Sequence, residues 1–413
     1  KTHQHYNALV CTGIGAHHAG QLLMWRLLLE ELMADGLLRV LVATGTVAAG
    51  VDFPARSVVI TAHSKRGSDG FQELTAAEFQ QMSGRAGRRG KDTVGFCVVA
   101  PSPFCDARAL LKIAKRPPEP LRSSYFPGAS TVLNLLRYRN VDDLRFTASR
   151  SLAAFYDKRE SADLQSEADQ VLVANPKLIS ASQHASQYVG GEGSSLSRED
   201  KKSLKRVRRL RNQAIELADR QVTLINAALK GLSELGYVEQ SSLSTKGYWA
   251  DNLCTGLVIE LAEIIEAKLF DDVSTEYLAA MVGSLCGDNH RRYLDAKRIL
   301  LKDEDVQKLA EILDRVHAVN LPGKAEKREV LRSAAHTVVM WLSAETWQEF
   351  RGLLMLSGVA EGDAARLLTQ TADHLNQLTR LYDSHPKLAL RAEEAKRRIL
   401  RPPLSEVINL DTP

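Results

Sequence analysis

Short apolar runs rich in β-branched residues punctuate the first hundred residues. LRVLVAT (38–44), SVVITA (57–62) and VGFCVVA (94–100) predict buried strands, and ALVCTGIG (8–15) predicts a strand end and a turn. The Leu-rich segment from Gln21 to Leu32 and AAEFQQMSGRAG (76–87) predict helices between them. Strands that alternate with helices indicate a parallel sheet covered by helices on both faces.

After residue 115 the pattern becomes almost entirely helical. KRPPEP, with prolines at 117, 118 and 120, predicts a linker, and short helices are expected at Ala129–Arg137 and Ser149–Phe155. GLSELGYVE and LSTKGYW (231–239 and 243–249) predict a helix followed by two short strands. This order is typical of a winged helix, formed by residues 116–157 and 223–250. Residues 251–413 predict a separate helical domain.

Residues 158–222 interrupt the predicted winged helix. A Gly/Ser-rich tip, VGGEGSSLS (189–197), lies between two long polar segments. Apolar positions recur in steps of three and four on the second arm, which predicts a helical hairpin with a narrow seam. The seam residues are Val207, Leu210, Ala214, Leu217, Gln221, Leu224 and Ala228, facing Leu164, Ala168 and Val171. The stretch Arg198–Arg211 holds eight basic residues against two acids, which fits either contact with a nucleic-acid backbone or a solvated helix face.

Composition narrows the class of protein. The residues are 44% hydrophobic and 25% charged, a composition typical of globular proteins. A chain of 413 residues is too long for one compact domain. The net charge of +4 permits a polyanionic partner without indicating one. No apolar run reaches the length of a membrane span, and the N-terminus has no signal core. The chain opens on Lys1, so we expect further residues before it. Five scattered cysteines without a CxxC pair predict reduced thiols in the cytoplasm.

QMSGRAGRRG (81–90) is the strongest chemical signal in the sequence. Arg85 and Arg88 are three residues apart, about one helical turn, so they can face one target. The planar, permanently charged guanidinium group binds phosphate and stabilises charge during phosphoryl transfer. The alternative is a solvated basic turn. This alternative would be favoured for RRG alone, but not for the whole string.

VATGTVAAGVDFPA (42–55) follows a predicted strand and therefore lies where open α/β sheets bind ligands. Thr44, Thr46 and Gly50 suit backbone contact with phosphates, and Asp52 can accept a hydrogen bond from a ribose hydroxyl. A plain strand-to-helix loop remains the alternative for this segment.

GIGAHHAG (13–20) contains His17 and His18, but no further ligand has a metalloprotease spacing, so we expect no metal. The sequence also lacks a GxxxxGK[ST] phosphate loop, because GRRGK is followed by Asp92 and has the wrong glycine spacing. A DExD/H box is likewise absent from the N-terminal α/β region.

These three motifs, in this order, resemble the second RecA-like domain of superkiller-type DExH-box RNA helicases, which belong to helicase superfamily two. SSYFPGASTVLNLLR resembles the winged-helix entry of that family, and EGDAARLL near residue 361 resembles its helical ratchet domain. The chain departs from the family in two respects that bear on function. The insertion at 158–222 has no room for a β-rich arch, and Asp52 stands where several members have Asn.

The resemblance implies an α/β fold followed by a mostly α fold. Residues 1–115 would be the second RecA-like domain without its first strands, residues 116–157 and 223–250 the winged helix, and residues 251–413 the ratchet-type domain. ATP and Mg²⁺ would be held mainly by a first RecA-like domain that this sequence does not contain.

The same resemblance assigns roles to individual residues. Arg85 and Arg88 would act as arginine fingers with Gln81 close to the nucleotide. Gly50 and Asp52 would touch the nucleotide. The nucleic-acid strand would be contacted by Thr44, Thr46 and Arg366.

The implied activity is ATP-dependent RNA unwinding in the cytoplasm, by the complete protein and not by this chain alone. Its partners would be single-stranded RNA, the N-terminal RecA-like half and a nuclease of RNA decay. Two alternatives stay open: a related DNA repair helicase, and a non-catalytic fragment that binds nucleic acid or protein.

Overall fold

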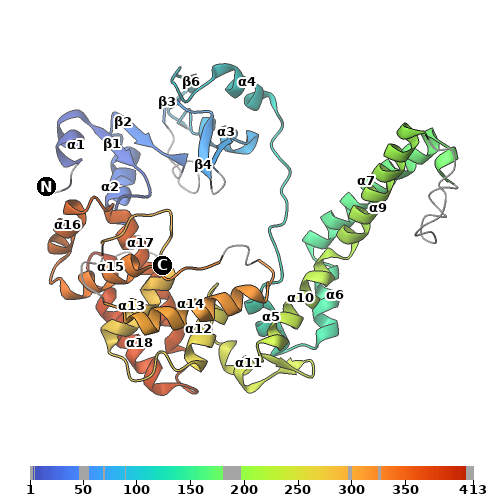
Figure 1. Ribbon diagram of the computed structural model, residues 1–413. Coiled ribbons are helices and arrows are strands. Elements are labelled where there is room, and N and C mark those ends of the chain that lie inside the picture. The colour runs from blue at the N-terminus through green and yellow to red at the C-terminus, as the bar shows by residue number, and fades with distance from the viewer. Residues whose placement is uncertain are drawn as a thin grey trace.

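The computed structural model describes residues 3, 5–45, 55–67, 70–88, 90–179, 197–295, 300–323 and 327–405. Figure 1 shows an α/β part at the N-terminal end, a helical body at the C-terminal end, and a long two-helix arm that projects from the body. An extended segment links the α/β part to the base of the arm.

The α/β part contains two parallel strand pairs. In the first, Ile14 of β1 lies opposite Val40 of β2; in the second, Ser57 of β3 lies opposite Phe96 of β6. A third, antiparallel pair, β4 with β5, was not predicted from the sequence. The elements in chain order are α1 (Tyr6–Thr12), β1 (Ile14–His17), α2 (Leu23–Ala34), β2 (Val40–Ala43), β3 (Ser57–Ile60), β4 (Ser64–Gly67), β5 (Gly70–Glu73), α3 (Ala76–Ser83), β6 (Phe96–Val99) and α4 (Ala107–Lys115).

Three of the predicted strands are confirmed, but most of their residues are not buried as expected, and two other expectations for this part are wrong. Residues 8–12 belong to helix α1, which ends because Gly13 adopts a left-handed conformation (φ 69°) and donates its N–H to Leu9. Helices also do not cover both faces of the sheet. Large apolar residues are exposed in both parallel strand pairs, namely Val40, Val42, Val59, Phe96 and Val98.

The predicted linker is anchored at its start. The carboxylate of Glu119 accepts hydrogen bonds from the backbone N–H groups of Ala76 and Ala77, each at 3.0 Å. These N–H groups belong to the first turn of α3, where no carbonyl of the helix itself can accept them. Their hydrogen bonds to the carboxylate hold the pKa of Glu119 below its usual value. The linker is therefore fixed to the helix that leads into the arginine-rich motif.

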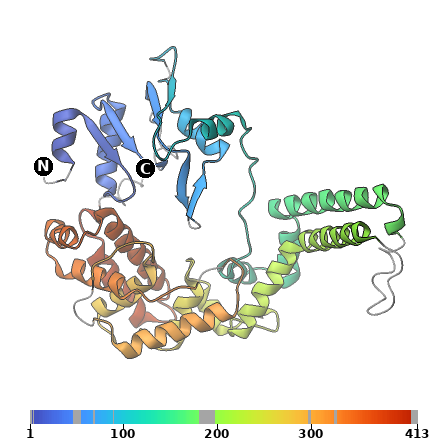
Figure 2. The same cartoon turned by 45° about the horizontal axis from the view of Figure 1, so that its top comes forward.

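The arm consists of α7 (Leu152–Ala174) and α9 (Arg198–Ala218), which lie side by side in Figures 1 and 2. Ala168, Val207 and Leu210 are buried in its seam, as the periodicity predicted. Two ion pairs also join the helices, Arg206 with Glu167 and Arg211 with Asp169. Ser149–Phe155, expected to be one short helix, instead spans the junction between α6 (Val141–Ser149) and α7.

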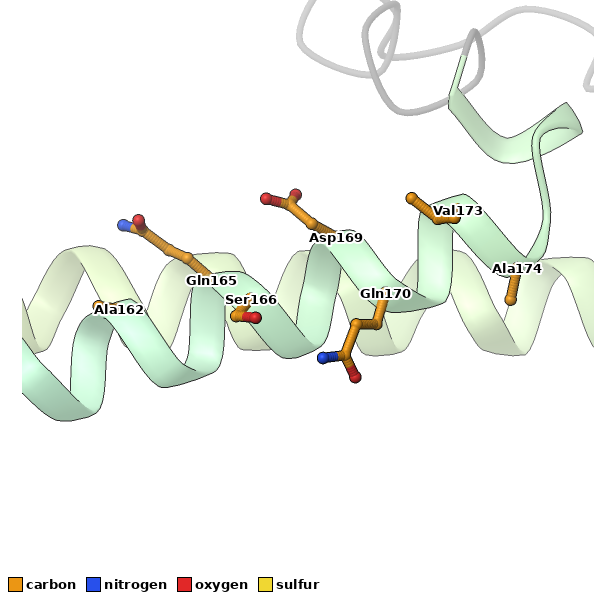
Figure 3. Close-up of a pocket in the computed structure, with 7 residues that line it drawn as sticks. All are labelled: Ala162, Gln165, Ser166, Asp169, Gln170, Val173 and Ala174. Carbon is orange, nitrogen blue, oxygen red and sulfur yellow. The ribbon is translucent and has the colours of Figure 1, made fainter.

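The outer face of α7 carries a shallow pocket, shown in Figure 3. Its lining side chains all come from this one helix and are exposed to solvent. They are Ala162, Gln165, Ser166, Asp169, Gln170, Val173 and Ala174. A pocket lined by a single helix face lacks the converging walls of a ligand site.

The base of the arm packs against the helical body through a small ribbon. The segment contains α5 (Ala129–Leu136), α10 (Arg220–Glu234), β7 (Val238–Glu239), β8 (Ser242–Leu243) and α11 (Thr245–Ala250). LSTKGYW was predicted to be a strand, but most of it forms α11, because the hydroxyl of Ser244 accepts the N–H of Gly247 and caps a helix there. The assignment of these elements to a winged helix stays a prediction.

The helical body contains seven further helices: α12 (Val258–Glu266), α13 (Thr275–Cys286), α14 (Asp303–Ala318), α15 (Arg332–Ser343), α16 (Trp347–Leu356), α17 (Glu361–Thr379) and α18 (Pro386–Ile399), counted over the described residues. One buried cluster extends from Ala129 to Leu404 and so includes both the ribbon segment and the body. Trp341 is fully buried, with its ring 5.2 Å from that of Trp347 and its Nε1 donating to the carbonyl of Ile399. This tryptophan therefore packs in the core and cannot stack on bases.

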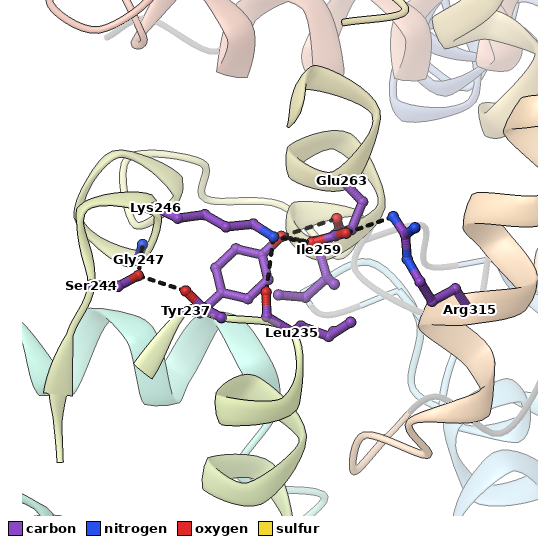
Figure 4. Close-up of polar contacts among 9 residues, drawn as sticks. Leu235, Tyr237, Ser244, Lys246, Gly247, Ile259, Glu263 and Arg315 are labelled. Carbon is purple, nitrogen blue, oxygen red and sulfur yellow. Dashed lines mark hydrogen bonds and ion pairs between the residues drawn. The ribbon is translucent and has the colours of Figure 1, made fainter. Parts of the chain in front are cut away.

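A buried carboxylate joins the ribbon segment to the body (Figure 4). Glu263 of α12 accepts hydrogen bonds from the Tyr237 hydroxyl at 2.9 Å and from Arg315 at 2.8 Å, and it pairs with Lys246. The side chain of Glu263 is 6% exposed, so the desolvation of its charge is offset by three donors: Tyr237 just before β7, Lys246 of α11 and Arg315 of α14. Burial and the adjacent carboxylate raise the pKa of Tyr237, which keeps this hydroxyl a donor.

Candidate functional site

The carboxyl ends of β1 and β2 meet at one edge of the first strand pair. His17 ends β1 opposite Ala43 of β2, and the N–H of Thr44 donates to the carbonyl of His17 at 3.3 Å. The turn 18–21 follows β1 at the same edge, and Thr44 is exposed there. Thr46, Gly50 and Asp52, the other predicted contacts of this loop, lie outside the described residues.

Backbone hydrogen bonds join the end of this loop to the arginine-rich motif. The N–H of Ala55 donates to the carbonyl of Arg85 at 2.9 Å, and the N–H of Gly87 donates to the carbonyl of Ala55 at 2.7 Å. Gly87 has a φ of 93°, a conformation that only glycine adopts without strain. Two motifs that are thirty residues apart in the sequence are thus fixed side by side.

The structure corrects the predicted helical spacing of the two arginines. Helix α3 ends at Ser83, so Arg85 and Arg88 lie in the turn beyond it and not one turn apart on a helix. Gln81 is still in α3 and is exposed, whereas both arginines are half-buried. Beyond the helix end, Gly87 with its positive φ lets the backbone turn towards Ala55.

Arg88 is held by a carboxylate whose role the sequence analysis missed. Asp92 accepts hydrogen bonds from Nε and Nη2 of Arg88 at 2.8 and 3.0 Å, and from its backbone N–H at 2.9 Å. These donors hold the pKa of Asp92 far below its usual range, so the pair stays charged at neutral pH. The signal was the i, i+4 spacing of Arg88 and Asp92, which the sequence analysis used only to exclude a phosphate loop.

A guanidinium group has five N–H donors, and the pair with Asp92 occupies two of them along one side. The outer edge of the group remains for a second anion. An arginine held in this way is both oriented and able to bind phosphate through a planar fork.

The two histidines of GIGAHHAG have structural partners. His17 is 3% exposed and its Nε2 lies 2.9 Å from the Glu30 carboxylate. Nδ1 of His18 accepts the N–H of Gly20 at 3.2 Å, and burial lowers the pKa of His18 below its usual value, so that the ring is neutral near pH 7. Among the described residues, no group of three or more His, Cys, Asp or Glu side chains could hold a metal ion.

Arg366 lies on α17, away from the arginine-rich motif, and its side chain is exposed. The first turn of the same helix is fixed by ion pairs on both sides: Glu361 with Arg351, and Asp363 with Arg291. Arg366 is thus a solvent-facing cation on a helix whose start is held in place.

Two family models match the chain. The helicase conserved C-terminal domain matches residues 7–90, which include the three motifs, and the DSHCT (NUC185) domain matches residues 240–406, which include α17. The chain is 43% identical over 124 residues to the DExH-box ATP-dependent RNA helicase DExH15, chloroplastic, of Arabidopsis thaliana, covering 30% of this chain and 11% of the relative. It is 36% identical over 164 residues to Superkiller complex protein 2 of Homo sapiens, covering 38% of this chain and 13% of the relative.

The chain is similar to the C-terminal portion of superkiller-type helicases.

A probable helicase, HelY of Mycobacterium tuberculosis, matches in the same way, with 35% identity over 152 residues, 37% of this chain and 17% of the relative. The matched segments thus span 11% to 17% of the length of these three relatives. The expectation of an α/β start followed by helices is confirmed. None of its described helices is long and apolar enough to cross a membrane.

Proposed function

We propose that this chain is the C-terminal half of an ATP-dependent helicase that translocates on single-stranded RNA and unwinds it for processing or decay. One observation carries the proposal. The backbone bonds of Ala55 with Arg85 and Gly87 bring the arginine-rich motif to the loop that follows β2. The proximity of the two motifs supports a shared phosphate-binding role, since guanidinium groups bind phosphate through a planar fork.

The chain's residues fit a nucleotide that is shared with a first RecA-like domain. Bound ATP with Mg²⁺ supplies the phosphoanhydride bond that is cleaved. Arg88, oriented by Asp92, stabilises charge on the transferred phosphoryl group, and Arg85 acts beside it. Gln81 lies one turn before them on α3. Gly50 and Asp52, which follow β2 in the sequence, complete the contacts with the nucleotide.

The RNA strand lies between the α/β part and the helical body in this proposal. Thr44 and Thr46 contact its backbone from one side, and Arg366 contacts it from α17. RNA is the favoured substrate because the Arabidopsis relative is named an RNA helicase, and a DNA repair helicase is the alternative. The winged helix, the cytoplasmic location and an RNA-decay nuclease partner belong to the same proposal.

The isolated chain provides the first test. We expect no RNA-stimulated ATP hydrolysis by the 413-residue chain, because phosphoryl transfer also requires a phosphate loop and a metal-binding carboxylate that its sequence lacks. Turnover above background in this chain would contradict the division of the site between two domains. Filter binding of matched RNA and DNA single strands to the complete helicase separates the RNA proposal from the DNA alternative. A complete protein that hydrolyses no ATP would favour a non-catalytic binding role.

A further inference from the structure

Helix α17 begins directly against the turn that follows β1. The N–H of Gly362, in the first turn of α17, donates to the carbonyl of Gly20 at 3.1 Å. The N-cap residue of this helix, Ala360, has no side chain that can accept a hydrogen bond. The α/β part therefore supplies an acceptor that the first turn of α17 lacks locally.

Glycine allows the two backbones to approach this closely. A Cβ atom on Gly362 would lie 2.5 Å from both the carbonyl oxygen of Ala19 and the carbonyl carbon of Gly20. Both neighbours are backbone atoms, so they cannot move aside as the end of a side chain would. Any larger residue at position 362 must separate the turn 18–21 from α17.

The start of α17 is also fixed to neighbouring segments of the helical body. Glu361 pairs with Arg351 and accepts a hydrogen bond from Nε1 of Trp347 at 3.2 Å, and Asp363 pairs with Arg291. Arg366 follows Gly362 by four residues, about 6 Å along the helix axis. A displacement of the turn 18–21 would therefore reach Arg366 within one helical turn.

On its other side, the turn is continuous with the candidate site. His17 ends β1 immediately before the turn, and its carbonyl accepts the N–H of Thr44 at 3.3 Å. A path of backbone hydrogen bonds thus runs from the loop after β2, through the edge of β1, to the first turn of α17. Figures 1 and 2 both show the body meeting the α/β part below α2, where this path crosses.

We propose that the contact between Gly20 and Gly362, here called the glycine joint, stays closed throughout the ATP cycle and makes α17 move with the second RecA-like domain. Gly362 is then a positioning residue, which holds Arg366 at a constant place relative to Thr44 on the RNA strand. The inference rests on the proposed function, because it assigns the joint a role in translocation.

The first experiment opens the joint in the complete helicase. With Gly362→Ala, RNA-stimulated ATP hydrolysis should persist, while the ATP consumed per base pair unwound should rise by roughly 3- to 30-fold, the range for residues that couple two sites. Gly352→Ala is the matched control, because a Cβ at this exposed position of α16 meets nothing within 4 Å. An unchanged ratio in a folded Gly362→Ala protein would overturn the inference.

The second experiment locks the joint and does not depend on whether Gly362→Ala folds. A Cβ on Gly20 would lie 3.7 Å from the Cβ of Ala360, within the range for a disulfide. In the double variant Gly20→Cys with Ala360→Cys, oxidation should leave unwinding at the level of the reduced protein, since the joint does not open. Each single variant under the same oxidant controls for the native cysteines.

Loss of unwinding on oxidation of the double variant, with ATP hydrolysis retained and reversal by dithiothreitol, would show that the joint opens and would overturn the inference alone. The wild-type complete helicase separates the two claims. If it neither hydrolyses ATP nor unwinds RNA, the proposed function fails; if it does both, only the variants decide the role of the joint.

Discussion

At the scale of single residues, the decisive feature is the orientation of Arg88. Its Nε and Nη2 are bound by Asp92 along one side, which leaves the outer edge of the guanidinium group for phosphate. The side chain of Asp92 is 9% exposed and that of Arg88 is 41% exposed, so the arginine is held by its carboxylate and still reaches solvent. Asp92 therefore determines the direction in which Arg88 points.

Replacing Asp92 by Asn should impair catalysis more than binding. The amide keeps the size of the side chain but loses the charge and one of the two acceptor oxygens, so Arg88 is misplaced. We expect kcat for RNA-stimulated ATP hydrolysis in the complete helicase to fall by about 100-fold, the cost of a catalytic group displaced by about 1 Å, with little change in KM. Asp163→Asn, on the exposed face of α7, is the control. A kcat near that of the wild type would show that Arg88 needs no such support.

Arg366 allows a test on the nucleic-acid side. A translocase must accept any sequence, so this exposed cation should contact backbone phosphate. Arg366→Ala should lower the salt dependence of RNA binding by about 0.7 log unit per log unit of salt for each phosphate that is no longer neutralised, about equally for different sequences. Arg380→Ala, which changes an exposed arginine just beyond the end of the same helix, is the control.

Unwinding by Arg366→Ala should fall more than basal ATP hydrolysis, because Arg366 lies away from the arginine-rich motif. If neither RNA affinity nor unwinding changes, α17 does not hold the strand. The basic stretch Arg198–Arg211 would then be the next candidate.

At the scale of elements, segments with a strong apolar pattern were predicted well, and short segments without one were predicted poorly. β2, β3 and β6 followed from short apolar runs rich in β-branched residues, and the seam of the arm followed from apolar periodicity. Helices α1 and α11 were misassigned because each is only six or seven residues long and is defined by its ends: Gly13 terminates α1 and Ser244 caps α11. The β4–β5 hairpin lacks the apolar alternation that predicts strands.

The sequence predicted which residue types form the candidate site, but it predicted their arrangement less well. The arginines were identified as candidates because the string QMSGRAGRRG and the phosphate-binding chemistry of arginine pointed to the same role. The bonds from Ala55 to Arg85 and Gly87, and the approach of Gly362 to Gly20, involve backbone atoms and have no side-chain pattern. Such contacts depend on tertiary structure and cannot be read from one sequence.

The arm of α7 and α9 should be dispensable for the motor. Ser161 donates to the carbonyl of Ala214 at 2.7 Å, so the two helices are adjacent where the arm leaves the body. Gln221 and Asp157, which are hydrogen-bonded to each other, lie on the body side of this point. The removable segment is therefore 162–213, shorter than the insertion 158–222 expected from the sequence.

Replacing residues 162–213 by a short Gly/Ser linker should leave RNA-stimulated ATP hydrolysis of the complete helicase within about twofold of the wild type, because the seam of the arm forms its own apolar cluster. Circular dichroism and thermal unfolding control for folding. A deletion protein that unfolds would show that the arm is part of the core. RNA affinity in the same variant reports whether Arg198–Arg211 contributes to binding.

At the scale of the whole molecule, the proposed function requires two regions of the chain. The α/β part holds the arginines and the loop after β2, and the helical body holds Arg366; the linker and the glycine joint connect them. Since the chain is similar to the C-terminal portion of superkiller-type helicases, its central role in the proposed function is to complete a nucleotide site that another domain begins.

The most direct test is the rate of RNA-stimulated ATP hydrolysis by the complete helicase with Arg88→Ala, measured at saturating ATP beside nucleotide binding. Loss of an arginine finger typically lowers kcat by on the order of 10³-fold, and we expect that loss here with ATP binding much less affected. Arg88→Lys should not restore the rate, because an ammonium group cannot bind Asp92 and phosphate through one planar fork. Hydrolysis at nearly the wild-type rate in Arg88→Ala would contradict the account.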